Sequence, residues 1–180
     1  MPTSPRDTLL ASSLLHTNPI PVTSEVKYLG LHHDRRLTWR MHIQTKRKRL
    51  DHKLRAMSWL LVHRSQPSLS NKILLYKCVL KPVWTYGIQL WGCAKPSHTQ
   101  ILQRIQSKLL RTLAKPPWFV SNLQLHTDFG ISFVKAEIRR TSLLYHRRLA
   151  GHTNVLVAAL STPPNVARRL KRRWPSDLPP

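Results

Sequence analysis

The chain has 180 residues, of which 30 are Lys or Arg and only 7 are Asp or Glu, so its formal net charge is +23. A positive excess of this size indicates a polyanionic partner, because Lys and Arg bound to phosphates release condensed counterions. The sequence has no run of about 18 apolar residues, so it predicts no membrane span. It also lacks the basic stretch followed by an apolar one that is typical of a signal peptide. We therefore expect a nuclear or cytoplasmic protein that is not secreted and has no membrane partner.

The N-terminal part predicts a disordered start and then a small β-hairpin. Residues 1–15 contain Pro and Ser without a clear period, so we expect them to be disordered or weakly helical. The hairpin is expected within residues 16–34. Pro19–Val22 resembles an edge strand, because Pro cannot donate to a β-ladder, and Val26–Leu31 supplies the second strand after a turn at 23–25. A lone hairpin is marginal in water, so it should pack on another part of the chain.

Residues 38–63 carry the clearest helical pattern, within a region at 35–115 that predicts a helical bundle. Thr38 is a suitable N-cap. At about 100° per residue, five apolar side chains fall within one narrow sector. They are Ile43, Leu50, Leu54, Met57 and Leu61.

The remaining surface of this helix is unusually basic. Ten basic residues and one acid, Asp51, lie between Arg35 and Arg64. A solvated helix face normally mixes charge signs for i,i+4 pairing, and this one does not, so we favour nucleic-acid contact over a merely solvated face. The candidate contacts flank the apolar sector or point away from it. They are Lys46, Arg47, Lys48, Arg49, Lys53 and Arg55.

Residues 70–92 are apolar almost all round, which predicts a buried helix with one solvent-facing stripe. The stripe consists of Lys77, Lys81, Thr85 and Gln89. Pro82 should kink this helix. Trp84, Tyr86 and Trp91 could stack on bases, but their apolar neighbours favour core packing.

Two further helices are expected. Ser97 should cap the first, which ends at Pro116 and has inward-facing positions at Ile101, Ile105, Leu109 and Leu113. Residues 116–160 form a C-terminal helical region, in which the last helix runs from Phe133 to about Ala150 and carries two further candidate nucleic-acid contacts, Arg139 and Arg140.

Residues 161–180 read as a basic, Pro-rich, disordered tail. Its cationic residues are Arg168, Arg169, Lys171, Arg172 and Arg173. Such a cluster indicates an interaction tail or, equally, a nuclear-localisation patch. The predicted fold class is therefore mainly α, with a small N-terminal β-hairpin, a helical bundle and this tail.

Catalytic constellations are not evident. Two-metal phosphoryl transfer needs carboxylates clustered around ions about 4 Å apart. The acids here are scattered: Asp7, Glu25, Asp34, Asp51, Asp128, Glu137 and Asp177. Five isolated glycines make no phosphate loop. His126 and Asp128 suggest turn chemistry before Gly130 rather than a catalytic dyad.

Two cysteines are too few for a disulfide framework and suggest a reduced compartment. The spacing of Cys78, Cys93 and His98 matches no common zinc finger, and the apolar surroundings of Cys78 predict a buried thiol. We therefore expect no metal site and no cofactor in this chain.

Several short motifs, colinear along residues 19–180, resemble the reverse transcriptases of jockey-type non-LTR retrotransposons. Val26-Lys-Tyr-Leu-Gly30 through Asp34, followed by Leu37-Thr-Trp39, resembles the palm-to-thumb junction of that family. Further similarities are Leu80-Lys-Pro82, Trp84-Thr-Tyr-Gly87, Gln89-Leu-Trp-Gly92, Gln106-Ser-Lys108, Pro117-Trp118, Gly130-Ile131 and Arg169-Leu-Lys-Arg172. Each motif is weak alone, and their shared order makes the set specific.

The resemblance implies that Tyr28, Leu29 and Gly30 form a primer-grip-like turn and that residues 35–115 are thumb-like. A thumb of this kind holds a template–primer duplex of RNA and DNA through its backbone. The family's catalytic aspartates belong to the palm, and none of the seven acids stands in that motif, so Mg²⁺ would serve only the full-length enzyme. The expected protein is a truncated reverse transcriptase without its catalytic palm, and that missing palm is a further candidate partner.

A second interpretation belongs to a different class. A basic, non-catalytic RNA-binding structural protein, unrelated to polymerases, would have the same charge and the same lack of clustered acids. The order of the motifs favours the truncated reverse transcriptase.

Overall fold

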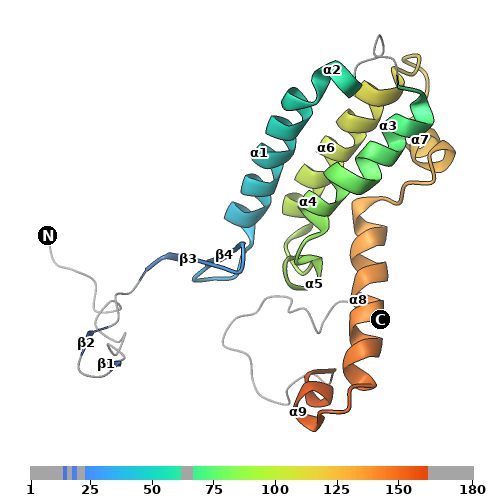
Figure 1. Ribbon diagram of the computed structural model, residues 1–180. Helices are drawn as coiled ribbons and strands as arrows, with labels where there is room; N and C mark the ends of the chain where they lie inside the picture. The colour runs from blue at the N-terminus through green and yellow to red at the C-terminus, as the bar shows by residue number, and fades with distance from the viewer. Residues whose placement is uncertain (1–13, 16–17, 20–22, 62–66, 162–180) are drawn as a thin grey trace, which may run out of the picture.

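The computed structural model describes residues 14–15, 18–19, 23–61 and 67–161. This part of the chain is mainly helical with a small antiparallel hairpin near the N-terminus, as the sequence predicted (Figure 1). The three longest helices are α1 (Arg40–Ala56), α6 (Pro96–Ala114) and α8 (Val134–Ala150). Among the described residues, no helix is both long enough and apolar enough to cross a bilayer.

The hairpin pairs β3 (Glu25–Tyr28) with β4 (Leu31–Asp34), so the predicted pairing was wrong. The chain reverses at Leu29 and Gly30, both with positive φ, which is the conformation that two-residue hairpin loops prefer. The turn expected at 23–25 instead leads into β3. A further two-residue ladder joins β1 (Leu14–Leu15) to β2 (Asn18–Pro19), and the rest of the expected edge strand lies outside the described residues.

Asp34, rather than Thr38, organises the start of α1. Its carboxylate accepts hydrogen bonds from the backbone N–H groups of Thr38 and Trp39, at 2.9 and 3.0 Å. Burial alone would raise the pKa of Asp34, but these N–H donors outweigh it and hold the pKa below its usual value. Trp39 occupies the cap position with φ of 61° and no side-chain cap. The predicted N-cap at Thr38 was therefore one residue too early, and its hydroxyl accepts from the Arg40 N–H at 3.4 Å.

The long helix expected to reach residue 63 is divided. α1 ends at Ala56, and α2 (Ser58–Leu61) resumes after Met57. Residues 62–66 lie outside the described part of the chain, so the expected end of this helix is not described.

The expected helix at 70–92 is broken into short segments. They are α3 (Leu69–Leu75), the π-helix η1 (Tyr76–Leu80), α4 (Lys81–Thr85) and α5 (Ile88–Trp91). Pro82 lacks the N–H that would bond to the carbonyl of Cys78, and the π-helical turn lies directly before it. Gly87 separates α4 from α5 with φ of 68°, and a Cβ there would meet the Leu31 side chain at 2.6 Å. Cys78 is exposed on η1, so the predicted buried thiol was wrong.

α6 begins with Pro96 in its first turn and Lys95 at the cap, so Ser97 is not the cap. The chain then forms α7 (Asn122–Asp128), which Ser121 caps, and beyond α8 it forms α9 (Val155–Ala158) and the 3-10 turn η2 (Ala159–Ser161). His126 Nδ1 lies 2.8 Å from the Ile131 carbonyl oxygen, and its ring stacks on Phe133. The interpretation of His126 as turn chemistry is confirmed.

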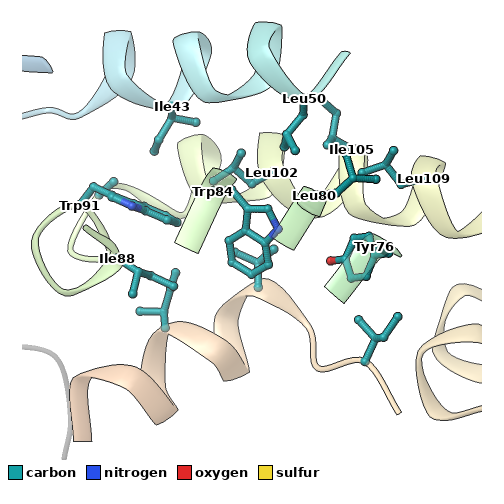
Figure 2. Close-up of a cluster of buried hydrophobic side chains, with 14 of the residues drawn as sticks. Ile43, Leu50, Tyr76, Leu80, Trp84, Ile88, Trp91, Leu102, Ile105 and Leu109 are labelled. Carbon is teal, nitrogen blue, oxygen red and sulfur yellow. The ribbon is translucent and has the colours of Figure 1, made fainter. Parts of the chain in front are cut away.

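The core lies where α1, α4, α5, α6 and α8 meet (Figure 2). Trp84 and Trp91 are buried there, as predicted, whereas Tyr86 is exposed. One buried polar group, Gln106, donates to the Tyr76 hydroxyl and to the Ser132 carbonyl, both at 3.0 Å. The largest fully buried apolar side chains include Ile43, Leu50, Leu61, Tyr76, Leu80, Ile88, Leu102, Leu110 and Leu113.

Candidate nucleic-acid interface

The outer face of α1 presents a dense cluster of cations. Arg47, Lys48, Arg49 and Arg55 are exposed and Lys53 is half-exposed, while Ile43 and Leu50 on the opposite face are buried. Lys53 and Arg55 also occupy the last turn, where the helix dipole favours positive charge. The nearest acid is Asp51, whose carboxylate lies 3.8 Å from Arg47 Nε. We call Arg47, Lys48, Arg49, Lys53 and Arg55 the α1 cationic face.

Lys46 does not belong to this face. Its residue surface is only 4% exposed, and its Nζ lies 4.9 Å from the centre of the Tyr86 ring. Burial lowers the pKa of Lys46, and the charge of Arg49 lowers it further. The prediction that Lys46 contacts nucleic acid is therefore wrong, because its ammonium is buried against Tyr86.

Two cations that were not singled out from the sequence lie opposite α1. Arg104 and Lys108 on α6 line an open pocket of about 240 Å³ together with Arg47 on α1. The other lining residues are Asp51, Ile101 and Ile105. The i,i+4 spacing of Arg104 and Lys108 places both on one face of α6, but only helix packing brings that face beside α1. The groove between α1 and α6 thus carries three cations against one carboxylate.

The two candidates on α8 have different surroundings. Arg139 and Arg140 are both exposed, but Arg140 Nη2 lies 2.6 Å from the buried carboxylate of Glu137. Lys81 Nζ lies 3.1 Å from the same oxygen and Lys81 is half-buried, so the predicted solvent-facing stripe is partly covered at this point. Burial alone would raise the pKa of Glu137, but hydrogen bonds from Arg140 and Lys81 outweigh it and lower the pKa. Arg140 therefore has a structural partner already.

The primer-grip-like turn is presented at the surface and tied to the helices. Tyr28 and Leu29 are exposed at the hairpin tip. The Tyr86 hydroxyl donates to the Leu29 carbonyl at 2.7 Å, and a Cβ on Gly30 would lie 3.6 Å from the Tyr86 ring. The expectation that the hairpin packs on another part of the chain is confirmed.

His42 on α1 is fully buried. The His32 N–H donates to His42 Nδ1 at 3.3 Å, and Nε2 has no hydrogen-bond partner among the described residues. Burial, followed by the charge of Lys46, lowers the pKa of His42 to about 4. This imidazole is therefore neutral at pH 7 and serves the packing of Trp39 and Trp91 around it.

Four of the five described acids, all except Glu25, are engaged in separate local contacts. Asp34 accepts from the two backbone N–H groups before α1, Asp51 faces Arg47, Asp128 accepts from Gln124, and Glu137 pairs with Lys81 and Arg140. Within the part of the chain that the structure describes, no group of three or more His, Cys, Asp or Glu side chains could hold a metal ion. The site is thus a set of cationic surfaces. The tail cluster at Arg168, Arg169, Lys171, Arg172 and Arg173 lies outside the described residues.

Comparison with known proteins shows which proteins the chain is similar to. The chain is 46% identical over 162 residues to the probable RNA-directed DNA polymerase from transposon X-element of Drosophila melanogaster, covering 89% of this chain and 18% of that protein. It is 35% identical over 182 residues to the RNA-directed DNA polymerase from mobile element jockey of Drosophila funebris, covering 97% and 19%. For the probable RNA-directed DNA polymerase from transposon BS of Drosophila melanogaster, the identity is 34% over 150 residues, covering 83% and 16%.

The chain is therefore related to the RNA-directed DNA polymerases of non-LTR retrotransposons. It spans less than a fifth of the length of these relatives, at 16–19%. No family model matches the chain, and no solved structure matches it.

Proposed function

We propose that this chain corresponds to the primer-grip, thumb and C-terminal region of a non-LTR retrotransposon reverse transcriptase. In this role it binds a template–primer duplex of RNA and DNA through the phosphate backbone. The observation that carries the proposal is the α1 cationic face. It is exposed along one helix, and the opposite side of that helix is buried in the core. The relatives, which are RNA-directed DNA polymerases, supply the class of ligand.

Residues 35–115 act as the thumb in this proposal, with α1 lying along the duplex. The groove between α1 and α6 adds Arg104 and Lys108 to the contact surface. The hairpin tip at Tyr28, Leu29 and Gly30 lies beside the primer strand, and the bond from Tyr86 fixes its position relative to α1. The palm that would carry the catalytic aspartates is a partner, because none of the described acids is grouped for metal binding.

Binding is expected to be independent of sequence, because the contacts are cations on helix surfaces that reach phosphates rather than base edges. The test is fluorescence anisotropy of the full chain with an RNA–DNA hybrid duplex at several salt concentrations. If roughly six phosphates are engaged, log K should fall with log[salt] at a slope of about −4 to −5. A flat salt dependence, or strong preference for one duplex over its scrambled version, would contradict the proposal.

A further inference from the structure

A second surface, distinct from the α1 cationic face, presents two aromatic rings to solvent. Trp118 is 91% exposed and Phe119 is 70% exposed, in the loop between α6 and α7 (Figure 1). Their rings meet edge to face, with centroids 6.0 Å apart and planes at 83°. Aromatic side chains are usually buried for their large apolar area, so such an exposed pair is a candidate binding surface.

The loop that presents these rings is held by polar contacts rather than by burial of the rings. Arg111 on α6 donates from Nε to Asn122 Oδ1 at 2.8 Å and from Nη2 to the Val120 carbonyl at 2.7 Å. The Val120 N–H donates to the Pro117 carbonyl, and the Ser121 hydroxyl accepts from the Gln124 N–H. The loop is thus pre-organised, which reduces the ordering cost of binding a ligand there.

A line of positive charge leads along α6 to this loop. Arg104, Lys108 and Arg111 lie on one face of α6, at intervals of four and three residues, and Lys115 follows four residues later at the C-cap. Arg104, Lys108 and Lys115 are exposed, and the eleven residue steps from Arg104 to Lys115 span about 16 Å. We call Arg104, Lys108 and Lys115 the α6 basic stripe, because the guanidinium of Arg111 is already bonded to the loop.

We propose that Trp118 and Phe119 form a stacking platform for the unpaired bases of a single-stranded nucleic acid whose phosphates follow the α6 basic stripe. The inference rests on the proposed nucleic-acid binding and shares Arg104 and Lys108 with it, but it adds the aromatic pair and a different form of ligand. Basic tracks combined with exposed aromatic rings are how proteins bind single strands without sequence preference, because every base has a stacking face. The face of Trp118 supports one base while Phe119 braces it from the side.

Charge complementarity selects nucleic acid over a protein as the occupant. An apolar protein surface would gain from the two rings, but the adjacent stripe would require a matching row of carboxylates. A single strand satisfies both features at once, with phosphates on the stripe and bases on the rings. The net charge of +23 favours the same occupant.

The test compares the full chain with Trp118→Leu and Trp118→Phe variants in anisotropy titrations. The probes are a labelled oligo(dT) single strand of about 20 nucleotides and a blunt duplex of equal length. Leu keeps apolar area without a π-face, so Trp118→Leu should weaken oligo(dT) binding roughly five- to a hundredfold, whereas Trp118→Phe should retain most of it. The salt slope should not change because no charge is removed. Trp59→Ala, at another tryptophan that is 75% exposed, is the matched control and should bind normally.

Unchanged oligo(dT) binding by Trp118→Leu would overturn the platform, as would equal losses on the single strand and the blunt duplex. A Trp118→Phe variant as weak as Trp118→Leu would overturn stacking, and a loss in Trp59→Ala as large as in Trp118→Leu would overturn the placement. The thermal unfolding midpoint is measured for each variant, and an unchanged midpoint shows that a loss of binding is not a loss of folding. Duplex binding by α1 is measured separately, so the platform and the proposed function can fail independently.

Discussion

The Nζ of Lys46 lies 4.9 Å from the centre of the Tyr86 ring, and the hydroxyl of the same ring donates to the Leu29 carbonyl at 2.7 Å. One tyrosine therefore joins α1 to the tip of the β3–β4 hairpin. Because Lys46 is buried, its ammonium interacts with the ring in partly desolvated surroundings, where a cation–π contact is strongest. The hairpin and α1 consequently form one connected unit, which the proposed duplex contact requires.

The first prediction separates the two roles of Tyr86. Tyr86→Phe removes the hydroxyl bond and keeps the ring, so it should lower the free energy of unfolding by about 0.5–1.5 kcal/mol. Tyr86→Leu should cost roughly 0.5–2 kcal/mol more, because Lys46 also loses its aromatic partner. Urea unfolding measures both variants. In a Lys46→Met background the additional cost of Leu over Phe should disappear, and its persistence there would show that the ring acts by packing alone.

The second prediction concerns the buried His42. Its pKa of about 4 in the folded chain lies below the ordinary value of 6.5, so the unfolded chain takes up the proton first as pH falls. The contribution of the neutral His42 to the free energy of unfolding is fully present above pH 6.5. It declines between pH 6.5 and 4, by about 3 kcal/mol in total. Urea unfolding across this range measures it, with His52→Gln on the exposed side of α1 as a control.

His42→Gln should lose this component of the pH dependence, although it also costs stability at neutral pH. The free energy of unfolding is plotted against pH for the wild type and for His42→Gln. The difference between the two slopes is the contribution of His42, because His32 and His33 are retained in both proteins. A wild-type slope that His42→Gln leaves unchanged would assign the pH dependence to other groups.

The third prediction concerns the ion-paired Glu137. Glu137→Gln should lower the free energy of unfolding by about 1–3 kcal/mol, less than for a fully buried pair because Lys81 and Arg140 reach solvent. Since its pKa is lowered in the folded chain, its contribution is present at neutral pH and is lost as pH falls through the acidic range. Wild type and variant should therefore converge in stability at low pH. Asp128→Asn, at an exposed acid bonded to Gln124, is the control and should change stability by less than about 0.5 kcal/mol.

The apolar period correctly located the inward side of the helices because helix geometry alone sets it. Ile43, Leu50 and Leu109 are all buried as expected. Lys46 sits at the edge of the same sector, and its burial depends on Tyr86, forty positions further along the chain. Only tertiary packing decides such an edge position, so the periodicity could not separate Lys46 from its exposed neighbours.

The hairpin register and the α6 cations escaped prediction for different reasons. A two-residue turn with positive φ is most readily recognised from Asn-Gly or Asp-Gly, and here a leucine fills the first position, at Leu29. Arg104 and Lys108 have the spacing of one helix face, but their position beside Arg47 follows from the packing of α6 on α1. Local sequence patterns predict a helix or strand, but they do not predict which other element packs against it.

The fourth prediction is that this chain alone has no polymerase activity. Among the described residues, no group of three or more His, Cys, Asp or Glu side chains could hold a metal ion, and two-metal phosphoryl transfer requires carboxylates gathered around ions about 4 Å apart. Primer extension on a poly(rA)–oligo(dT) substrate with Mg²⁺ or Mn²⁺ should show no incorporation above buffer. Incorporation that disappears when any one of the seven acids is replaced would contradict this expectation.

The last prediction locates the duplex contact on α1. Replacing Lys48, Arg49 and Arg55 by Gln should leave the fold intact, since all three side chains are exposed. The same triple variant should make the salt slope of duplex binding shallower by roughly two to three units, about one for each lost phosphate contact. The control replaces Lys135, Arg147 and Arg148, three exposed cations on α8, and removes the same charge from a different helix.

Deleting residues 165–180 provides the competing measurement. If the tail adds nonspecific electrostatic attraction, its loss should weaken binding while the thermal transition stays unchanged, and the effect of the α1 substitutions should persist in the shortened chain. A polycationic tail acting alone gives the opposite result: the deletion abolishes duplex binding, and the α1 and α8 triple variants bind alike. If the α1 triple variant weakens binding no more than the α8 triple variant, binding depends on net charge and not on the α1 surface. Both variants lose the same charge, so only a specific surface makes their effects differ.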